Sequence, residues 1–462
     1  MLSDAAQASL ISDAKNANFP DARLCARLAQ LTAKLAGNPS ASFPKVLSSV
    51  ELEGGYRFFG NHVVTPDGIL GGHFDSTRAM VEKEPTVLVV HDTSTFAFDA
   101  GGAREGLGRV RSKGQAFFGH VSLVLSDDGQ RRPLGVAALS TWVRGEEPSR
   151  GEKARWWDSV QLSSKRLGNA RNVVHLMDRE GDDYALFEHL IDGEHRFIVR
   201  LSHDRILGES TRKIPYKISD AMARVECFVE REATLSKRID GARSPKQKSA
   251  HPSRGKRKVT LSIGGTSITL KRPTTQEHTV TPLLTLNIVR VWEADPPKGE
   301  TPVEWLLVTS EPIDSADALL LTVDRYRARW TIEEFFKAIK TGCSFPKRQL
   351  GDYQGLINAL AVFVPIACRL LALRSAAHND ASAPATRVLE PDEIEVLRAL
   401  GRRPLPTNPT MRDALLAVAA LGGHQKSAPD PGWLTISRGF AELGLLTRGW
   451  RAAKLQPACD QR

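Results

Sequence analysis

The sequence predicts a mixed α/β core with helical segments at both ends of the chain. Between about residues 71 and 374, short apolar runs suited to buried strands alternate with amphipathic helical patterns. Residues 1–70 and the residues after Arg374 carry helical patterns. From about 204 to 300 the pattern changes to short alternating stretches, which predict a β-rich insertion within the core.

These patterns divide the chain into three predicted domains. Residues 1–70 form a helical domain, residues 71–374 form the core, and residues 375–462 form a second helical domain. The stretch SAAHNDASAPAT, which follows Arg374, has the composition of a linker. A chain of 462 residues is long enough for two to four domains, so this division suits its length.

The individual elements follow from periodicity and capping signals. The segment DARLCARLAQLTAKLAG repeats leucine at helical spacing and ends at Gly37, a C-cap signal. The run EPTVLVVHD predicts a buried strand that ends at Asp92, and NVVHLMD predicts another that ends at Asp178. In chain order, the core is predicted to contain a strand (84–92), a hairpin with its turn at 127–130 (115–144), a helix (152–168), a strand (172–178), a helix (182–191), a strand (195–202), the insertion, a strand (305–313) and one helix (315–342).

Four polar residues share one face of the last predicted helix. Their offsets return to nearly the same angle at about 100° per residue. A soluble helix has little reason to align a phenol, a guanidinium, a carboxylate and an ammonium. A site that binds a metal ion beside a phosphate chain has such a reason, because the carboxylate binds the cation and the other three groups hold anionic oxygens. The four residues are Tyr326, Arg329, Glu333 and Lys340.

Three acids lie at structured positions of the predicted core. Asp92 and Asp178 end strands that can be neighbours in a mixed sheet, and Glu333 lies on the last helix. Three carboxylates suit a pair of Mg²⁺ ions, for which we expect Mn²⁺ to substitute. Each acid also has a simpler interpretation, namely an Asx turn at Asp92, a helix N-cap or surface acid at Asp178, and a surface helix acid at Glu333.

The charge of the chain indicates a polyanionic partner. The net charge is +10 and the pI is near 9.4, which favours a nucleic-acid-binding protein over a merely basic soluble one. Residues 231–258 contain ten Lys/Arg and two Asp/Glu. This segment is either a solvated loop or an arm that lies along DNA phosphates.

The expected location is the cytoplasm, in association with the nucleoid. Five dispersed cysteines form no CxxC pair, which indicates a reducing compartment and argues against structural zinc. The N-terminus has no signal-peptide pattern. The apolar stretch 355–373 contains Asn358, Pro365 and Arg369, so we interpret it as a kinked core helix rather than a membrane span.

Six sequence blocks occur in an order typical of one known family. The last block fits the spacing Y-x2-R-x3-E-x6-K. Together the blocks resemble the DDE transposases of the bacterial insertion-sequence-4 family, and the resemblance extends over nearly the whole chain. The blocks are DARLCARL (21–28), GGYRFFGN (54–61), VVHDTSTF (89–96), LMDREGDD (176–183), KGETPVEWLLVTSEP (298–312) and YRARWTIEEFFKAIKTG (326–342).

The resemblance implies a fold and an activity. It implies an RNase H-like catalytic core, an N-terminal DNA-binding domain and a C-terminal dimerisation domain. It assigns Asp92, Asp178 and Glu333 as catalytic, metal-binding acids. The implied activity is cut-and-paste transposition by a homodimer, through strand cleavage, hairpin formation and resolution, and strand transfer. Its substrates are the inverted-repeat ends of an element and target DNA, both double-stranded.

The resemblance also implies DNA contacts. Tyr326, Arg329 and Lys340 would hold phosphates, with Arg200 and Lys337 beside them. Trp305 matches a tryptophan that stacks on a flipped base, although without the family it would be interpreted as a core aromatic. Trp330 is an ambiguous neighbour of this group. The candidates for recognition of the element end are Arg23, Arg27, Tyr56 and Arg57, but Cys25 and Ala26 depart from the basic pattern usual before Arg27.

Two other functions fit the same sequence. A non-transposing DNA endonuclease could use the same core, and an inactive DNA-binding relic or inhibitor could keep the fold without the chemistry. Inverted-repeat ends around the gene, or strand-transfer products in vitro, would distinguish a transposase from a plain nuclease.

Overall fold

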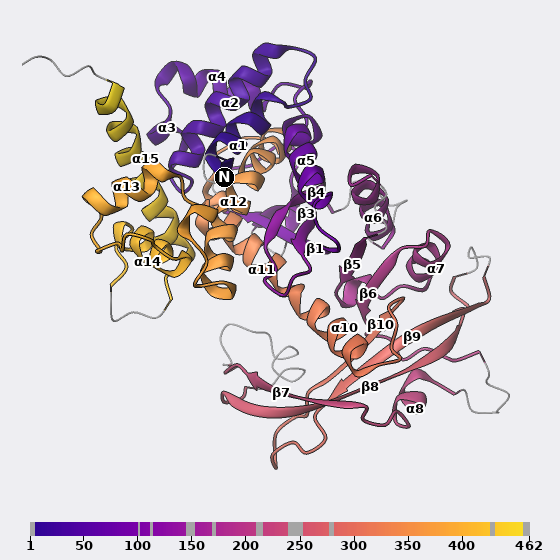
Figure 1. Ribbon diagram of the computed structural model, residues 1–462. Coiled ribbons are helices and arrows are strands. Elements are labelled where there is room, and N and C mark those ends of the chain that lie inside the picture. Colours follow the sequence, from indigo (N-terminus) through magenta and orange to yellow (C-terminus); the bar gives the residue numbers. More distant parts are fainter. Residues whose placement is uncertain are drawn as a thin grey trace, which may run out of the picture. The chain divides into compact units, whose positions relative to one another are not determined.

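The computed structural model describes residues 5–99, 102–110, 114–144, 153–168, 172–208, 216–238, 253–276, 281–425 and 430–455. The chain forms two compact units, each assembled from separate segments. Figure 1 shows the elements of both units in sequence colours. The first unit contains 1–151, 158–172 and 330–462, and the second contains 152–157 and 173–329.

The N-terminal part of the first unit is helical, as predicted. Its α2 buries Leu28, Leu31 and Leu35 along one face and ends at Gly37. A capping box between Ser48 and Glu51 starts α4. The helices are α1 (Ala5–Lys15), α2 (Ala22–Gly37), α3 (Phe43–Val46), α4 (Ser49–Phe59) and α5 (Pro66–Val81).

The strands of the first unit form an antiparallel group around β3. The prediction that the first strand ends at Asp92 is wrong, because β1 continues to Phe98. The residues from Asp92, opposite Val121, to Phe98, opposite Gln115, pair with β3. The strands are β1 (Val87–Phe98), β2 (Gly108–Val110), β3 (Gly114–Ser126) and β4 (Pro133–Trp142), and the predicted hairpin turn lies between the last two.

The first unit also contains the C-terminal helices, which surround α12. The 18-residue window of α12 with a mean hydropathy of 2.2 would suit a membrane span by composition, yet 83% of it is buried. It packs on α5 and β4, so the predicted core helix is confirmed, and it continues to Asn379, inside the predicted linker. The helices after the core are α11 (Trp330–Lys337), η2 (Ala338–Gly342), η3 (Phe345–Lys347), α12 (Tyr353–Asn379), η4 (Ala385–Arg387), α13 (Pro391–Leu400), α14 (Met411–Leu421) and α15 (Trp433–Leu455).

The second unit is built on a mixed sheet. Its strands follow the order β5-β6-β10-β9-β8-β7, in which β5 and β6 are parallel and the other pairs are antiparallel. The long strands β8 and β9 confirm the predicted β-rich insertion (Figure 1). The elements are β5 (Val173–Met177), η1 (Arg179–Gly181), α7 (Tyr184–Asp192), β6 (Arg196–Arg200), α8 (Ile218–Met222), β7 (Val229–Leu235), β8 (Arg257–Lys271), β9 (Leu283–Trp292), β10 (Glu304–Thr309) and α10 (Ala316–Ala328). Half of the basic segment 231–258, namely residues 239–252, lies outside the described residues.

The single helix predicted over 315–342 is wrong, because the segment contains three helical pieces. α10 ends at Ala328, where the N–H of Arg329 bonds three residues back to Tyr326. α11 then gives way to the π-helical η2, closed by a bond from the Cys343 N–H to the Ala338 carbonyl at 2.8 Å. The rotation of about 100° per residue therefore does not continue from Tyr326 to Lys340. The prediction that the four polar residues share one helical face assumed that it does.

The predicted fold class is confirmed. The protein is a mixed α/β chain with helices at both ends, and its core shows the chain order expected of an RNase H-like fold. That order is three antiparallel strands (β1, β3 and β4), α6 (Ala154–Arg166), β5, α7 and β6. The boundaries of the three predicted domains stay predictions.

Candidate active site

In the first unit, Lys340 lies beside the strand face that carries Asp92. Asp92, Ser94 and Phe96 alternate along β1 and so share one face of the strand. The Lys340 Nζ donates to the Ser94 Oγ at 2.7 Å and lies 5.3 Å from the centroid of the Phe96 ring. The π-helical turn of η2 thus places the Lys340 ammonium group against the face of β1 that carries Asp92, a predicted metal ligand.

The electrostatics of Lys340 reflect this position. Burial lowers the pKa of its ammonium, whereas the charge of Asp92 opposes that shift. The Asp92 carboxylate accepts the backbone N–H of Thr93 at 2.8 Å. A half-buried cation close to a fixed carboxylate can hold an anionic oxygen that approaches the acid.

Glu333 and its neighbour Glu334 lie on α11, which packs on β1. Glu334 accepts the Trp433 indole N–H at 3.2 Å and the Lys337 ammonium at 2.7 Å, so it joins α11 to α15. The Lys337 Nζ lies 5.7 Å from the centroid of the Trp330 ring, and Trp330 is 55% exposed. Lys337 and Trp330 therefore form an exposed pair on the helix that carries Glu333.

In the second unit, the predicted phosphate-binding residues gather around Arg200. The Arg200 guanidinium lies 5.8 Å from the Trp305 ring centroid, and it interacts electrostatically with the phenol of Tyr326. The Trp305 and Tyr326 rings meet edge to face at 6.2 Å. An indole face, a phenol and a guanidinium are thus combined at the end of β6, next to β10.

This cluster has an excess of positive charge. Burial lowers the pKa of Arg200, and the charges of Arg179 and Arg329 lower it further. Burial likewise raises the pKa of the Tyr326 phenol, whereas the charges of Arg200 and Arg329 lower it and the charge of Asp178 adds a smaller increase. The guanidinium groups of Arg179, Arg200 and Arg329 repel one another, and the negative group beside them is the carboxylate of Asp178. A bound anion such as phosphate would stabilise this arrangement.

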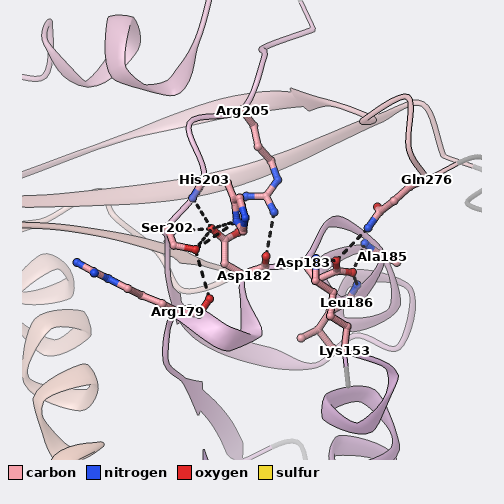
Figure 2. A network of polar contacts seen from close by, with 10 residues as sticks. All are labelled: Lys153, Arg179, Asp182, Asp183, Ala185, Leu186, Ser202, His203, Arg205 and Gln276. Carbon is pink, nitrogen blue, oxygen red and sulfur yellow. Dashed lines mark hydrogen bonds and ion pairs between the residues drawn. The ribbon is translucent and has the colours of Figure 1, made fainter. Parts of the chain in front are cut away.

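A buried network fixes the loop that carries Asp178. Asp178 follows β5 directly, as predicted, and accepts the Glu180 N–H at 2.8 Å. Four residues later, the fully buried Asp182 carboxylate accepts the N–H groups of Ser202 at 2.5 Å and His203 at 2.8 Å, and it pairs with Arg205 (Figure 2). Ser202 lies two residues after Arg200, so Asp182 joins the Asp178 loop to the strand end that carries Arg200.

Asp183, the next residue, has a different structural role. It caps α7 by accepting the Ala185 N–H at 3.1 Å, and its side chain also binds Lys153 at 2.9 Å and Gln276 at 3.0 Å (Figure 2). The two adjacent aspartates therefore anchor different elements.

The N-terminal candidates lie on two helices that pack together, α2 and α4. Arg23 is exposed and pairs with Asp21, and the guanidinium of Arg27 packs against α4 at Gly54, where a Cβ would come within 2.9 Å of it. The remaining two, Tyr56 and Arg57, lie on α4, where Tyr56 is 40% exposed and Arg57 pairs with Glu53.

The sequence interpretation missed three residues of these groups. Ser94 could have been found from the period of two that places it on the same strand face as Asp92. Arg179 directly follows Asp178 and had a signal in its charge. Asp182 had none, because only the fold shows that this acid of the DREGDD segment is buried.

The donor chemistry of the predicted acids fits Mg²⁺, which prefers carboxylate oxygens. Across the ranges that the structure describes, no group of three or more His, Cys, Asp or Glu is assembled that could hold a metal ion. The joint metal-binding role of Asp92, Asp178 and Glu333 stays a prediction.

Comparison with a family model supports a DNA transposase. Residues 6–64 match the family model "Transposase DNA-binding". This region contains α2 and α4, so DNA is supported as the partner of these helices. A solved structure, the piggyBac transposase synaptic complex with hairpin DNA, is similar over 99% of this chain and 72% of that chain, with 9% sequence identity and a TM-score of 0.36. A likeness at that TM-score carries no argument about mechanism.

Proposed function

We propose that this chain is a metal-dependent DDE transposase of the insertion-sequence-4 family, similar to the transposon-5 transposase. The observation that carries the proposal is the cluster of Arg200, Tyr326 and Trp305 beside Asp178. It occurs in a chain whose N-terminal helices match a transposase DNA-binding family. A nuclease needs an anion site next to an acid, and this cluster supplies one.

The proposed metal ligands are Asp92, Asp178 and Glu333. When bound, two Mg²⁺ or Mn²⁺ ions would help to activate the attacking oxygen and to stabilise the departing one. The support comes from the carboxylate chemistry and from the sequence spacing of these acids.

The cationic residues would hold the substrate. The Lys340 ammonium lies close to Asp92, and the partly buried Arg200 guanidinium lies beside Tyr326, whose phenol interacts with Asp178, so each cation would bind phosphate oxygens of the substrate. Arg329 and the Tyr326 phenol would orient the same backbone. The indole of Trp305 would stack on a base extruded from a DNA hairpin, which restores roughly 1–3 kcal/mol of lost stacking.

The proposed reaction uses one kind of step throughout, which is in-line displacement at phosphorus. Water nicks one strand, and the freed 3′-hydroxyl attacks the opposite strand to give a hairpin. The hairpin is opened again, and the 3′-ends are joined to target DNA. A homodimer would hold the two inverted-repeat ends, in the nucleoid of a bacterial cell.

The test is replacement of each acid by Ala. The Asp92→Ala, Asp178→Ala and Glu333→Ala variants should lose cleavage of element-end DNA down to background while they still bind it. Cleavage is measured on labelled duplexes with Mg²⁺, and binding is measured by fluorescence anisotropy without it. Asp99→Ala removes an exposed acid just after β1 and serves as the control. Normal cleavage by any one of the three would refute its role, and cleavage by the wild type without strand transfer would favour the plain endonuclease.

A further inference from the structure

Arg348 is a buried cation held by main-chain carbonyl groups. It is 3% exposed. Its Nη2 donates to the Pro39 carbonyl and the Cys343 carbonyl, each at 2.5 Å, and its Nη1 donates to the Ala41 carbonyl. Its guanidinium also lies 4.4 Å from the centroid of the Phe363 ring. One side chain therefore binds three separate points of the backbone.

These points belong to two functional parts of the first unit. Pro39 and Ala41 lie in the loop between α2 and α3, inside the range that matches the transposase DNA-binding family. Cys343 is the C-cap of η2, the π-helical segment that contains Lys340. Arg348 thus joins the DNA-binding helices to the end of the segment that places Lys340 beside Ser94.

The chain is shaped to bring Arg348 back to this position. After Cys343, Ser344 adopts a left-handed conformation with φ of 49°. The short η3 follows, and its C-cap residue is Arg348. The reversal lets a residue beyond η2 bind the terminal carbonyl of that segment.

Burial of the Arg348 charge is unfavourable for the stability of the fold, so stability alone does not account for this residue. In the described part of the chain, no acidic side chain pairs with it, and its Nε has no hydrogen-bond partner. Burial lowers the pKa of the guanidinium to about 10. An apolar side chain between Phe43 and Phe363 would fill the same space without desolvating a charge.

We propose that Arg348 is a positioning residue that couples engagement of DNA by the N-terminal helices to the placement of Lys340. The inference rests on the proposed function, because it needs DNA both at α2 and at the active site. The carbonyls of Pro39 and Ala41 move with the DNA-binding helices, and Arg348 transmits that position to Cys343 and so to η2.

The experiment compares Arg348→Met and Arg348→Lys with the wild type. Methionine keeps an unbranched apolar side chain between the two rings and removes every donor, whereas lysine keeps the charge and up to three donors. The DNA is a duplex made from the inverted repeat that flanks the coding sequence. Affinity is measured by anisotropy, and cleavage is measured in single turnover at saturating protein with Mg²⁺.

Arg348→Met should bind this duplex within about twofold of the wild type. Its single-turnover cleavage should fall about 10- to 100-fold, because a small misplacement of a positioned group has an effect of that order. Arg348→Lys should recover most of the rate. Hydrogen exchange of amides 338–343 should slow when the duplex binds to the wild type, and should not slow in Arg348→Met.

Arg369→Met is the matched control. Arg369 is a partly buried arginine of the first unit, with 10% of its side chain exposed, and it pairs with Glu393 and lies 5.2 Å from the Phe440 ring. Its replacement should lower the melting temperature and leave single-turnover cleavage by the folded fraction unchanged.

The outcomes separate the two proposals. A wild-type protein that neither binds nor cleaves the duplex refutes the proposed function. If the wild type cleaves, then normal cleavage by Arg348→Met overturns the coupling, and so does a loss of binding equal to the loss of cleavage. If Arg348→Met does not fold, Arg348→Lys decides. The coupling is also overturned if Arg348→Lys cleaves only at the background rate while its DNA affinity is normal and its hydrogen-exchange protection of η2 is unchanged.

Discussion

At the scale of single residues, the structure separates acids that the sequence cannot distinguish. Asp178, Asp182 and Asp183 lie within one short segment, yet each has different partners. Asp182 is the most deeply buried and receives the most donors. It holds the Asp178 loop against the chain that follows Arg200, so the geometry of the proposed site depends on a residue that would not touch DNA.

Asp182→Asn should therefore destabilise the second unit and slow cleavage. An amide offers one acceptor oxygen where the carboxylate offers two, and it leaves the buried Arg205 without its ion pair, a loss of about 3–5 kcal/mol. Urea unfolding measures the stability, and single-turnover cleavage measures the rate under conditions where the variant is folded.

Asp183→Asn is the comparison variant, because Asp183 caps α7 and does not bind the chain after Arg200. It should lose only about 1 kcal/mol, as a capping residue does, and keep the cleavage rate. Equal rates for the two variants would contradict the positioning role of Asp182.

At the scale of elements, β5 carries a titratable group that makes the fold sensitive to acid. His175 is 1% exposed, and burial lowers its pKa to about 3, with a smaller contribution from His195. The unfolded chain takes up a proton below about pH 6.5 while the folded chain does not. Stability is therefore complete above pH 6.5 and decreases as the pH falls towards 3.

We expect His175→Leu to remove this dependence. Between pH 7 and pH 5, the wild type should lose about 2 kcal/mol of unfolding free energy more than the variant does, at about 1.4 kcal/mol per pH unit below 6.5. Urea titrations at both pH values measure the difference. His62→Leu, which replaces an exposed histidine, should follow the wild type. A parallel pH response of His175→Leu and the wild type would show that His175 is protonated in the folded state.

At the scale of the whole chain, the N-terminal DNA-binding helices belong to the same compact unit as the C-terminal helices. The Phe43 and Phe363 rings stack with centroids 6.4 Å apart. The Asn358 amide donates to the Phe59 and Val64 carbonyls, each at 2.9 Å. These contacts make the helices before β1 part of the packing around α12.

A chain that begins at residue 65 should consequently lose stability as well as DNA recognition. The loss of α1 to α4 would expose the apolar face of α12 and leave the Asn358 amide without acceptors. We expect aggregation, or a melting temperature at least about 5 °C lower than that of the full chain. Thermal denaturation of both proteins measures this, and equal melting temperatures would show that the N-terminal helices fold independently.

The sequence predictions were correct where local interactions decide the structure, and they were wrong where interactions between distant residues decide it. The strand that ends at Asp178 was predicted correctly because a continuous apolar run and a following acid are local signals. The end of the first strand was wrong because pairing with β3, a long-range interaction, extends β1 past Asp92. The uninterrupted helix over 315–342 was wrong because periodicity does not register a change from α to π hydrogen bonding.

The sequence by itself determined the mixed α/β class, the position of most elements, the basic character and the identity of the candidate acids and cations. Only the tertiary structure decided that Lys340 lies against Ser94, that Arg200 joins Tyr326 and Trp305, and that Asp182 and Arg348 are buried anchors. The physical reason is that local patterns determine which elements form, whereas burial and side-chain partners depend on contacts between residues far apart in the chain. For Arg348 and Pro39 that separation is 309 residues.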